Sequence, residues 1–131
     1  MCIRDSSEII SKYPEANFGV HFQNDNGCAV ANSMVAVDLG VNHVQGTING
    51  YGERTGNADL CTLIPNLTLK KGYQTISERS LGRLTQTANH IAELVNVAID
   101  SRHPYVGSSA FTHKAGLHAS GMAKDLSLIH I

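Results

Sequence analysis

Tryptophan is absent from this sequence, proline and cysteine occur three times each, and neither sign of charge dominates. The net charge of −1, from acids and bases that are interspersed, excludes the basic footprint of a nucleic-acid-binding protein. No apolar run reaches the roughly 18 residues that cross a bilayer, and no secretory apolar stretch opens the chain, so we expect no membrane association. Cys2, Cys28 and Cys61 are odd in number and form no Cys-x-x-Cys motif, which indicates a reducing, cytoplasmic setting.

What is present is typical of a globular protein. The chain has 131 residues, the usual length of one domain, and 42% of them are hydrophobic. Residues 1–6 and 126–131 break the patterns beside them and resemble translated adapter sequence, so we expect a native fragment from about Ser7 to Asp125. The alternative is that the first hexapeptide is a genuine N-terminus and the last a genuine strand.

Apolar spacing and turn residues predict alternating strands and helices. Two short apolar runs predict strands at 17–22 and 43–48. Helical spacing predicts helices at about 28–39 and 57–70, the second interrupted near Pro65, and the end of an earlier helix at 7–13. Asn24 to Gly27 offer capping groups at the start of the helix that follows, and Asp25 in particular is expected to cap it. This order predicts parallel strands joined by helical crossovers.

The spacing of apolar residues and the composition of the sequence change after Gly72. Residues 77–99 carry an apolar stripe that predicts one long amphipathic helix, capped by Ser77. Residues 100–125 are rich in Gly, Ser, His and Pro and predict a loop. The organisation expected is therefore a barrel-like α/β part at 7–72 and the start of a mainly helical segment at 73–125.

Polar residues follow both predicted strands. The first is followed by His-Phe-Gln-Asn-Asp at 21–25 and the second by Gln-Gly-Thr-Ile-Asn-Gly-Tyr-Gly-Glu-Arg-Thr-Gly-Asn at 45–57. Residues two apart on a strand face the same way, so His21 and Gln23 are predicted to point to one spot. An imidazole there is a good metal ligand, whereas an amide oxygen is a weaker one. A polar strand end without metal is the alternative.

These two segments resemble the last two barrel strands of the citramalate, isopropylmalate and homocitrate synthases. The resemblance implies a partial (β/α)8 TIM barrel, comprising its last two strands and their helices, followed by a mainly helical segment. It implies a divalent metal (Mn, Mg or Zn) on His21, Gln23 and Asn57, although the family's motif is His-x-His-Asn-Asp and Gln23 departs from it. It also assigns substrate contacts to Asn24, Glu53 and Gly56.

A third segment, Ala-Phe-Thr-His-Lys-Ala-Gly-Leu-His at 110–118, resembles the part of these synthases that reaches over the partner subunit's active site. The resemblance implies that His118 is a catalytic acid or base, a role suited to a group that titrates near neutrality. His113 is expected to hold the loop together. Ser120 stands where some citramalate synthases carry aspartate, which puts acetyl-CoA contacts in question.

The activity implied is a metal-assisted Claisen condensation of acetyl-CoA with a 2-oxo acid, in a cytoplasmic homodimer of branched-chain amino-acid biosynthesis. The run at 64–67 and Pro104 to Gly107 look most like citramalate synthase, which uses pyruvate. The barrel strand that carries the family's metal-binding aspartate and an arginine is not in this sequence, so we expect the fragment alone to be inactive.

Other interpretations stay open. Isopropylmalate synthase, which uses 2-oxoisovalerate, is the alternative enzyme, and a non-catalytic relic of the family is the alternative outside enzymes. A lyase of the same superfamily is disfavoured by the segment at 113–118. Glu53 and Arg54 are expected to pair with each other or with absent parts, and Cys28 and Cys61 are expected in the core. His43, His90 and His103 have no ligand-spaced partners.

Overall fold

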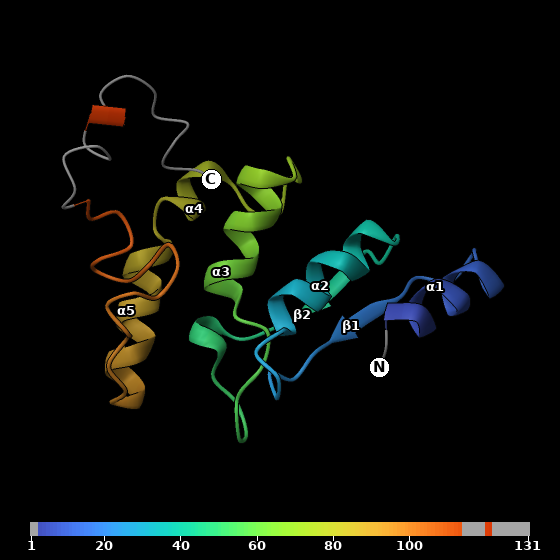
Figure 1. Cartoon of the computed structure of the whole chain (residues 1–131), viewed down its shortest axis with the longest axis horizontal. Coiled ribbons are helices and arrows are strands. Elements are labelled where there is room, and N and C mark those ends of the chain that lie inside the picture. The colour runs from blue at the N-terminus through green and yellow to red at the C-terminus, as the bar shows by residue number, and fades with distance from the viewer. Residues whose placement is uncertain (1–2, 114–119, 122–131) are drawn as a thin grey trace.

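Two short strands lie among helices in the computed structural model, which describes residues 3–113 and 120–121 (Figure 1). The strands are β1 (Gly19–His21) and β2 (His43–Gln45). The helices are α1 (Ile3–Lys12), α2 (Ala29–Asp38), α3 (Leu60–Pro65), α4 (Glu78–Leu81) and α5 (Leu84–Val95), with a 3-10 turn η1 (Ile48–Gly50) and a π-helix η2 (Asn66–Lys70). Among these described residues, no helix is both long and apolar enough to cross a membrane.

β1 and β2 pair in parallel, as the strand–helix–strand order predicted. Val20 lies opposite Val44, and α2 forms the crossover between the two strands. Both strands are shorter than expected because the chain after His21 changes partner. The Phe22 carbonyl accepts from the Ala58 amide at 3.0 Å, and the Asn24 amide donates to the Gly56 carbonyl at 2.9 Å. The end of β1 is therefore tied to the segment that follows β2.

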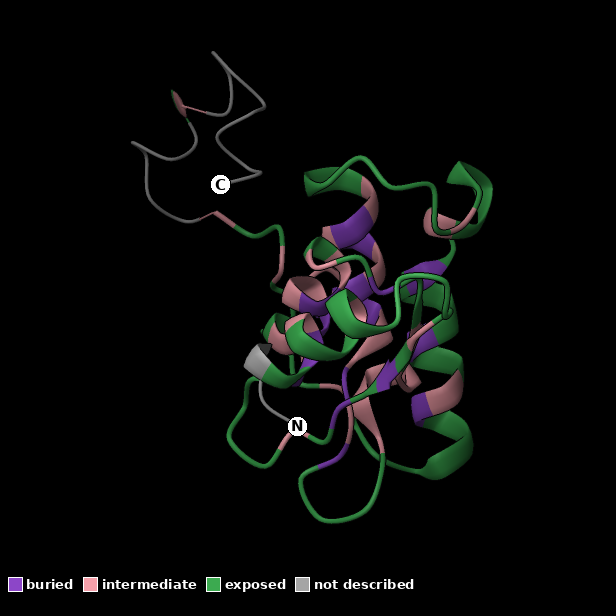
Figure 2. Ribbon diagram, turned by 90° about the vertical axis from the view of Figure 1, so that its right-hand side faces the viewer, coloured by how far each residue is buried: buried purple, intermediate pink, exposed green. Residues whose placement is uncertain are grey.

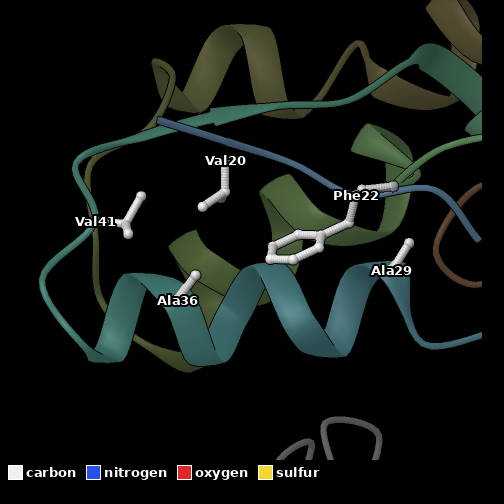
Figure 3. Packing of buried hydrophobic residues seen from close by; sticks show 6 residues of the cluster. Val20, Phe22, Ala29, Ala36 and Val41 are labelled. Atoms are coloured by element: carbon white, nitrogen blue, oxygen red, sulfur yellow. The ribbon is translucent and has the colours of Figure 1, made fainter. Parts of the chain in front are cut away.

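The core beside the strands is built largely from small and β-branched side chains. Figure 3 shows Val20 and Phe22 facing α2, with the Phe22 ring lying against the helix. Val30, Met34, Val37 and Val41 recur at helical spacing in the sequence, but of these four only Val41, beyond the end of α2, is fully buried. The residues of α2 that are buried are Ala29, Ser33 and Ala36. Small side chains let the helix approach the strands closely, and the larger apolar ones are half-buried beside them (Figure 2).

The start of α2 corrects two predictions. Asn24 Oδ1 accepts from the Ala29 amide at 3.1 Å, and Asn26 Oδ1 accepts from the Cys28 amide at 3.2 Å. Capping thus comes from these asparagines, whereas Asp25 pairs with Arg54. Cys28 precedes the helix and is exposed, so its assignment to the core was wrong. Helix α2 ends before Gly40, which has a φ of +103°, as a C-terminal glycine does.

The helix predicted at 57–70 forms in two parts. α3 begins at an Asp59 cap, whose carboxylate accepts from the Cys61 amide at 3.0 Å. The change to π-helical geometry comes directly after Pro65, which has no N–H to continue the α-helical ladder. The Lys71 amide then bonds to the Asn66 carbonyl, five residues back. The predicted interruption near Pro65 is therefore a change of helical register.

The long helix predicted over 77–99 was wrong in its extent. Ser77 caps α4 as expected, accepting from the Ser80 amide at 3.2 Å. The helix then breaks at Gly82 and Arg83, and α5 ends where Asn96 adopts a left-handed conformation with φ 55°. Glycine has a low helix propensity, which favours a break at this point. The chain from 100 to 113 contains turns and bends, as predicted.

Residues 3–6 extend α1, and Ser6 is 5% exposed. A hexapeptide of foreign origin is expected to pack poorly, and the burial of Ser6 departs from that expectation. The foreign origin of the two hexapeptides stays a prediction, and 126–131 lie outside the described residues.

Candidate active site

The polar segments after β1 and β2 meet in space. His21 Nε2 lies 3.0 Å from Asn57 Oδ1, as expected from the strand ends. Asn57 Nδ2 donates to the Tyr51 carbonyl at 3.1 Å, which leaves Oδ1 as the amide atom that faces the imidazole. Because a carbonyl oxygen only accepts, His21 Nε2 carries the proton in this arrangement. We refer to His21 and Asn57 as the strand-end pair.

Glycines shape the turn that delivers Asn57. Gly56 has a φ of +83°, and a Cβ there would lie 2.0 Å from the Gly50 carbonyl oxygen. A Cβ on Gly52 would lie 2.2 Å from Asn57 Nδ2. Thr47 Oγ1 also donates to the Tyr51 carbonyl. The turn therefore closes on Asn57 so tightly that side chains at these glycines would displace it.

Gln23 lies beside the strand-end pair but is engaged elsewhere. Its Oε1 accepts a hydrogen bond from Arg54 Nη2, and the same nitrogen donates to Asp25 Oδ1 at 2.7 Å. Thr55 Oγ1 lies 3.3 Å from that carboxylate oxygen. Arg54 thus pairs with Asp25, and the expected pairing of Glu53 with Arg54 is not formed. The side chains of Arg54 and Asp25 are 62% and 59% exposed, so their attraction is strongly screened.

The three residues expected to bind substrate differ in their contacts and in their exposure. Asn24 and Gly56 are joined by a backbone hydrogen bond, and the Asn24 side chain caps α2. Glu53 is exposed, and its carbonyl accepts from the Gly56 amide at 2.9 Å. His118 lies outside the described residues, while Ser120 is exposed.

His21 and Asn57 together fit a divalent ion as one nitrogen and one oxygen donor. His21 would bind through Nε2 only after its proton moves to the other ring nitrogen. Gln23 fits the ion less well, because its oxygen would have to leave Arg54. Within residues 3–113 and 120–121, no group of three His, Cys, Asp or Glu side chains is placed to hold a metal.

Sequence reasoning missed a second polar cluster near the site. Asp59, two residues after Asn57, lies with Oδ2 3.3 Å from His103 Nε2. The two residues are 44 positions apart, so no local spacing could signal the contact. Tyr105 Oη also donates to Asn66 Oδ1 at 2.8 Å. Both contacts attach the loop at 100–109 to α3 and η2.

Cys61 is buried beside this cluster, as expected. The pKa of its thiol is raised to about 11, chiefly by burial; the hydrogen bond with Asn49 lowers it and the Asp59 carboxylate raises it, both by smaller amounts. Cys61 Sγ donates to Asn49 Oδ1 at 3.4 Å. A thiol held in its protonated form is a poor nucleophile, so Cys61 is a packing residue.

Comparison with known proteins gives one family. The family model described as HMGL-like matches residues 3–94. The chain is 49% identical over 120 residues to an (R)-citramalate synthase of Aquifex aeolicus and 54% identical over 111 residues to one of Synechocystis. These matches cover 92% and 85% of this chain. A probable 2-isopropylmalate synthase of Archaeoglobus fulgidus is 43% identical over 108 residues, or 82% of the chain.

The chain spans about a fifth of the length of these curated relatives, from 20% to 23%. Among solved structures, an HMG-CoA lyase from Acinetobacter baumannii, in complex with coenzyme A and 3-methylmalate, matches with a TM-score of 0.65 at 20% identity. That match covers 86% of this chain and 38% of the other. The N-terminal domain of a putative aldolase from Bacteroides vulgatus matches with a TM-score of 0.56 at 21% identity, over 84% and 37%. At these identities the likeness concerns the fold, of which this chain is a small, partial α/β unit.

Proposed function

Because this chain belongs to the HMGL-like family, we propose that it is part of an acyltransferase that condenses acetyl-CoA with a 2-oxo acid. The observation that carries the proposal is the strand-end pair, His21 and Asn57 at 3.0 Å, at the carboxyl ends of two parallel strands. In barrels of parallel strands, reactive groups lie at these ends. Curated relatives of high identity are synthases, which supports this class of reaction.

In this proposal His21 and Asn57 orient the 2-oxo acid at the strand ends. A divalent metal, when bound by His21 and Asn57 together with donors outside these residues, would supply polarisation of the substrate ketone. Gln23 is proposed as a weaker third donor in that set. The turn at 50–56 holds the Asn57 side chain in place. Substrate binding therefore does not have to order Asn57, because folding has already done so.

Asn24, Glu53 and Gly56 are proposed to contact the substrates. The Asn24 amide is already held by the Gly56 carbonyl, so these two residues line one continuous edge beside the strand-end pair. His118 is proposed as the group that moves a proton at the acetyl methyl or at the product oxygen. We propose further that the whole protein is a cytoplasmic homodimer. In it, the segment at 110–118 of one subunit would contribute to the active site of the partner subunit.

Pyruvate is proposed as the 2-oxo acid, with citramalate as the product. The identities of 49% and 54% to citramalate synthases, against 43% to a probable 2-isopropylmalate synthase, support this choice. 2-Oxoisovalerate is the second candidate substrate. A relic without catalytic function is the third interpretation, and the Gln23 departure from the family motif is what favours it.

A chimeric enzyme tests the proposal. The 120 matching residues of the Aquifex aeolicus relative are replaced by those of this chain, and citramalate formation from pyruvate and acetyl-CoA is measured. A second chimera uses the Archaeoglobus fulgidus relative as host and 2-oxoisovalerate as substrate. Both proteins are first shown to be folded by their circular dichroism.

The proposal predicts condensation in both chimeras, with the larger fraction of parental activity kept in the citramalate host. A folded chimera that is inactive in both hosts, even at saturating metal, would favour the relic. Better retention in the isopropylmalate host would move the substrate assignment to 2-oxoisovalerate.

A further inference from the structure

Two hydrogen bonds meet at the Tyr51 carbonyl, beside the strand-end pair. Thr47 Oγ1 donates to this carbonyl at 2.5 Å, and Asn57 Nδ2 donates to it at 3.1 Å. A backbone carbonyl has two lone pairs, so it can accept from both groups at once. All three residues are half-buried, which limits the access of water to these bonds. The Tyr51 carbonyl thus joins the Thr47 hydroxyl to the side chain of Asn57.

The Tyr51 carbonyl determines which atom of the Asn57 amide faces His21. A carbonyl oxygen only accepts, so Nδ2 must face it, and Oδ1 is then the atom that lies 3.0 Å from His21 Nε2. The terminal torsion of asparagine is broad and roughly two-fold, so it does not by itself select one orientation. The opposite orientation would turn the NH2 group toward the imidazole, and an NH2 group offers hydrogens and no lone pair to a cation. Asn57 therefore offers an oxygen donor in the orientation that the Tyr51 carbonyl selects.

The backbone at Tyr51 has little restraint of its own. Tyr51 stands between Gly50 and Gly52, and glycine populates more backbone conformations than any other residue. The Tyr51 amide bonds to the Ile48 carbonyl at 3.4 Å, which is long for a hydrogen bond. The orientation of the peptide unit between Tyr51 and Gly52 therefore depends on the groups that donate to its carbonyl.

The backbone of Thr47, in contrast, is held on both sides of the turn. Its amide donates to the Ala58 carbonyl at 3.0 Å, and its carbonyl accepts from the amides of Gly50 and Leu60 at 3.2 and 2.9 Å. A β-branched side chain also has few favourable χ1 rotamers, which restricts the direction of the hydroxyl. The Thr47 hydroxyl therefore projects from a backbone that is fixed without the help of Tyr51.

We propose that Thr47 is a positioning residue, whose hydroxyl holds the Tyr51 carbonyl and thereby keeps Asn57 Oδ1 turned toward the strand-end site. The consequence for catalysis rests on the proposed function, in which His21 and Asn57 orient the 2-oxo acid, whereas the placement of Asn57 does not. Serine at position 47 would keep the hydroxyl and lose the methyl group. Alanine would lose both, and valine would replace the hydroxyl by a methyl group of similar size. Together these substitutions separate the hydrogen bond from packing.

The placement is tested on the 131-residue chain with Thr47→Val, Thr47→Ala and Thr47→Ser. Hydrogen exchange is followed at the Asn57 side-chain amide by NMR. We expect exchange about fivefold faster in Thr47→Val and Thr47→Ala, as loss of one net hydrogen bond implies, and within about twofold of the native rate in Thr47→Ser. Thr87→Val in α5, which removes a hydroxyl that donates to the Arg83 carbonyl, is the matched control and should leave this exchange unchanged.

The backbone amides of Ala58 and Leu60 report whether the fold itself is kept. They should exchange at the native rate in Thr47→Ala, which carries the test if the valine methyl disturbs the turn by its contact with the Tyr51 carbonyl. Equal acceleration at these amides and at the Asn57 side chain would overturn the proposal, because the whole turn would then have opened. Asn57 exchange that is equal in Thr47→Ala and the native chain would overturn it as well. Exchange in Thr47→Ser as fast as in Thr47→Ala would assign the effect to the methyl group instead of the hydroxyl.

In the active Aquifex aeolicus chimera, Thr47→Ala should lower kcat/KM for pyruvate about fivefold, while the KM for acetyl-CoA changes less than about twofold. Thr47→Ser should keep kcat/KM for pyruvate within about twofold of the parent. Equal kcat/KM in Thr47→Ala and the parent would refute the role in catalysis. An inactive parental chimera with the exchange result intact would instead refute the proposed function and leave the placement of Asn57 by Thr47 standing.

Discussion

At the scale of single residues, Gly56 shows how one missing side chain permits the site. Its φ of +83° is left-handed, and a Cβ would lie 2.0 Å from the Gly50 carbonyl oxygen. Gly27 has a similar φ of +73° but open space around it. Comparing substitutions at Gly27 and Gly56 therefore separates the free-energy cost of a left-handed backbone from the cost of the close contact.

We expect Gly27→Ala to lower the free energy of unfolding by about 1 kcal/mol, the usual cost of a left-handed residue. Gly56→Ala should cost about 2–4 kcal/mol, because the added methyl also collides with backbone. Urea unfolding of both variants measures the difference. Equal losses would mean that the turn opens freely and does not fix Asn57.

Cys61 makes stability depend on pH. Burial raises the pKa of its thiol from 9.0 to about 11, so the unfolded chain loses this proton first as the pH rises. The unfolded state then binds fewer protons than the native state, and the free energy of unfolding falls between pH 9 and 11. We expect this fall, on the order of 1 kcal/mol, in the parent chain but not in Cys61→Ala. Urea unfolding at pH 8 and pH 10 checks it, and parallel falls in both proteins would contradict it.

Gln23 can be tested as a ligand by substitution in the chimera. Gln23→His should tighten Mn²⁺ binding about tenfold, because imidazole is a better metal donor than an amide oxygen. The Gln23 oxygen, in addition, must give up its hydrogen bond with Arg54 before it can bind the ion. Electron paramagnetic resonance of free Mn²⁺ measures the affinity, with Gln23→Ala as the companion variant. Identical affinity in all three proteins would show that residue 23 is not a ligand.

At the scale of elements, Asn49 joins three of them. It lies in η1 with φ 59°, donates through Nδ2 to the Ala88 carbonyl of α5 at 2.9 Å, and accepts from Cys61 of α3. Asparagine tolerates a left-handed conformation better than most residues do, so backbone and side chain agree here. The end of β2 is thereby fixed to α5.

Asn49→Gly should lower the free energy of unfolding by about 1–2 kcal/mol, since the backbone conformation is kept while the hydrogen bond to the Ala88 carbonyl and the weaker one from the Cys61 thiol are lost. Hydrogen exchange of α5 amides should accelerate with it. Asn42→Ala, which removes an exposed contact with Asn17, serves as the control and should change stability by less than about 0.5 kcal/mol. A stable Asn49→Gly with unchanged exchange in α5 would contradict the role of Asn49.

Local rules predicted some elements and failed at others for physical reasons. The parallel direction of β1 and β2 and the extent of α2 followed from apolar spacing and from the asparagines near Gly27. The buried face of α2 did not, because close packing on the strands selects Ala29 and Ala36 over larger side chains. The break at Gly82 did not follow from the apolar spacing, which continues through it, although the low helix propensity of glycine favours a break there.

At the scale of the whole molecule, the strand-end pair was predictable and its surroundings were not. Strand ends in a parallel sheet share one edge, so His21 and Asn57 could be placed together from the sequence. The contacts of Arg54 with Asp25 and of His103 with Asp59 join residues 29 and 44 positions apart, and only the folded chain brings them together. The contacts around the strand-end pair could therefore be identified only from the structure.

The most direct test of the account is the kcat/KM of condensation by the Aquifex aeolicus chimera with and without Asn57→Ala. The strand-end pair predicts a loss of about 100-fold or more, because Asn57 orients both His21 and the substrate site. Asn42→Ala in the same chimera should keep kcat/KM within about twofold of the parent, as expected of an exposed contact away from the site. A folded Asn57→Ala chimera that condenses acetyl-CoA with pyruvate as fast as its parent would contradict the central claim.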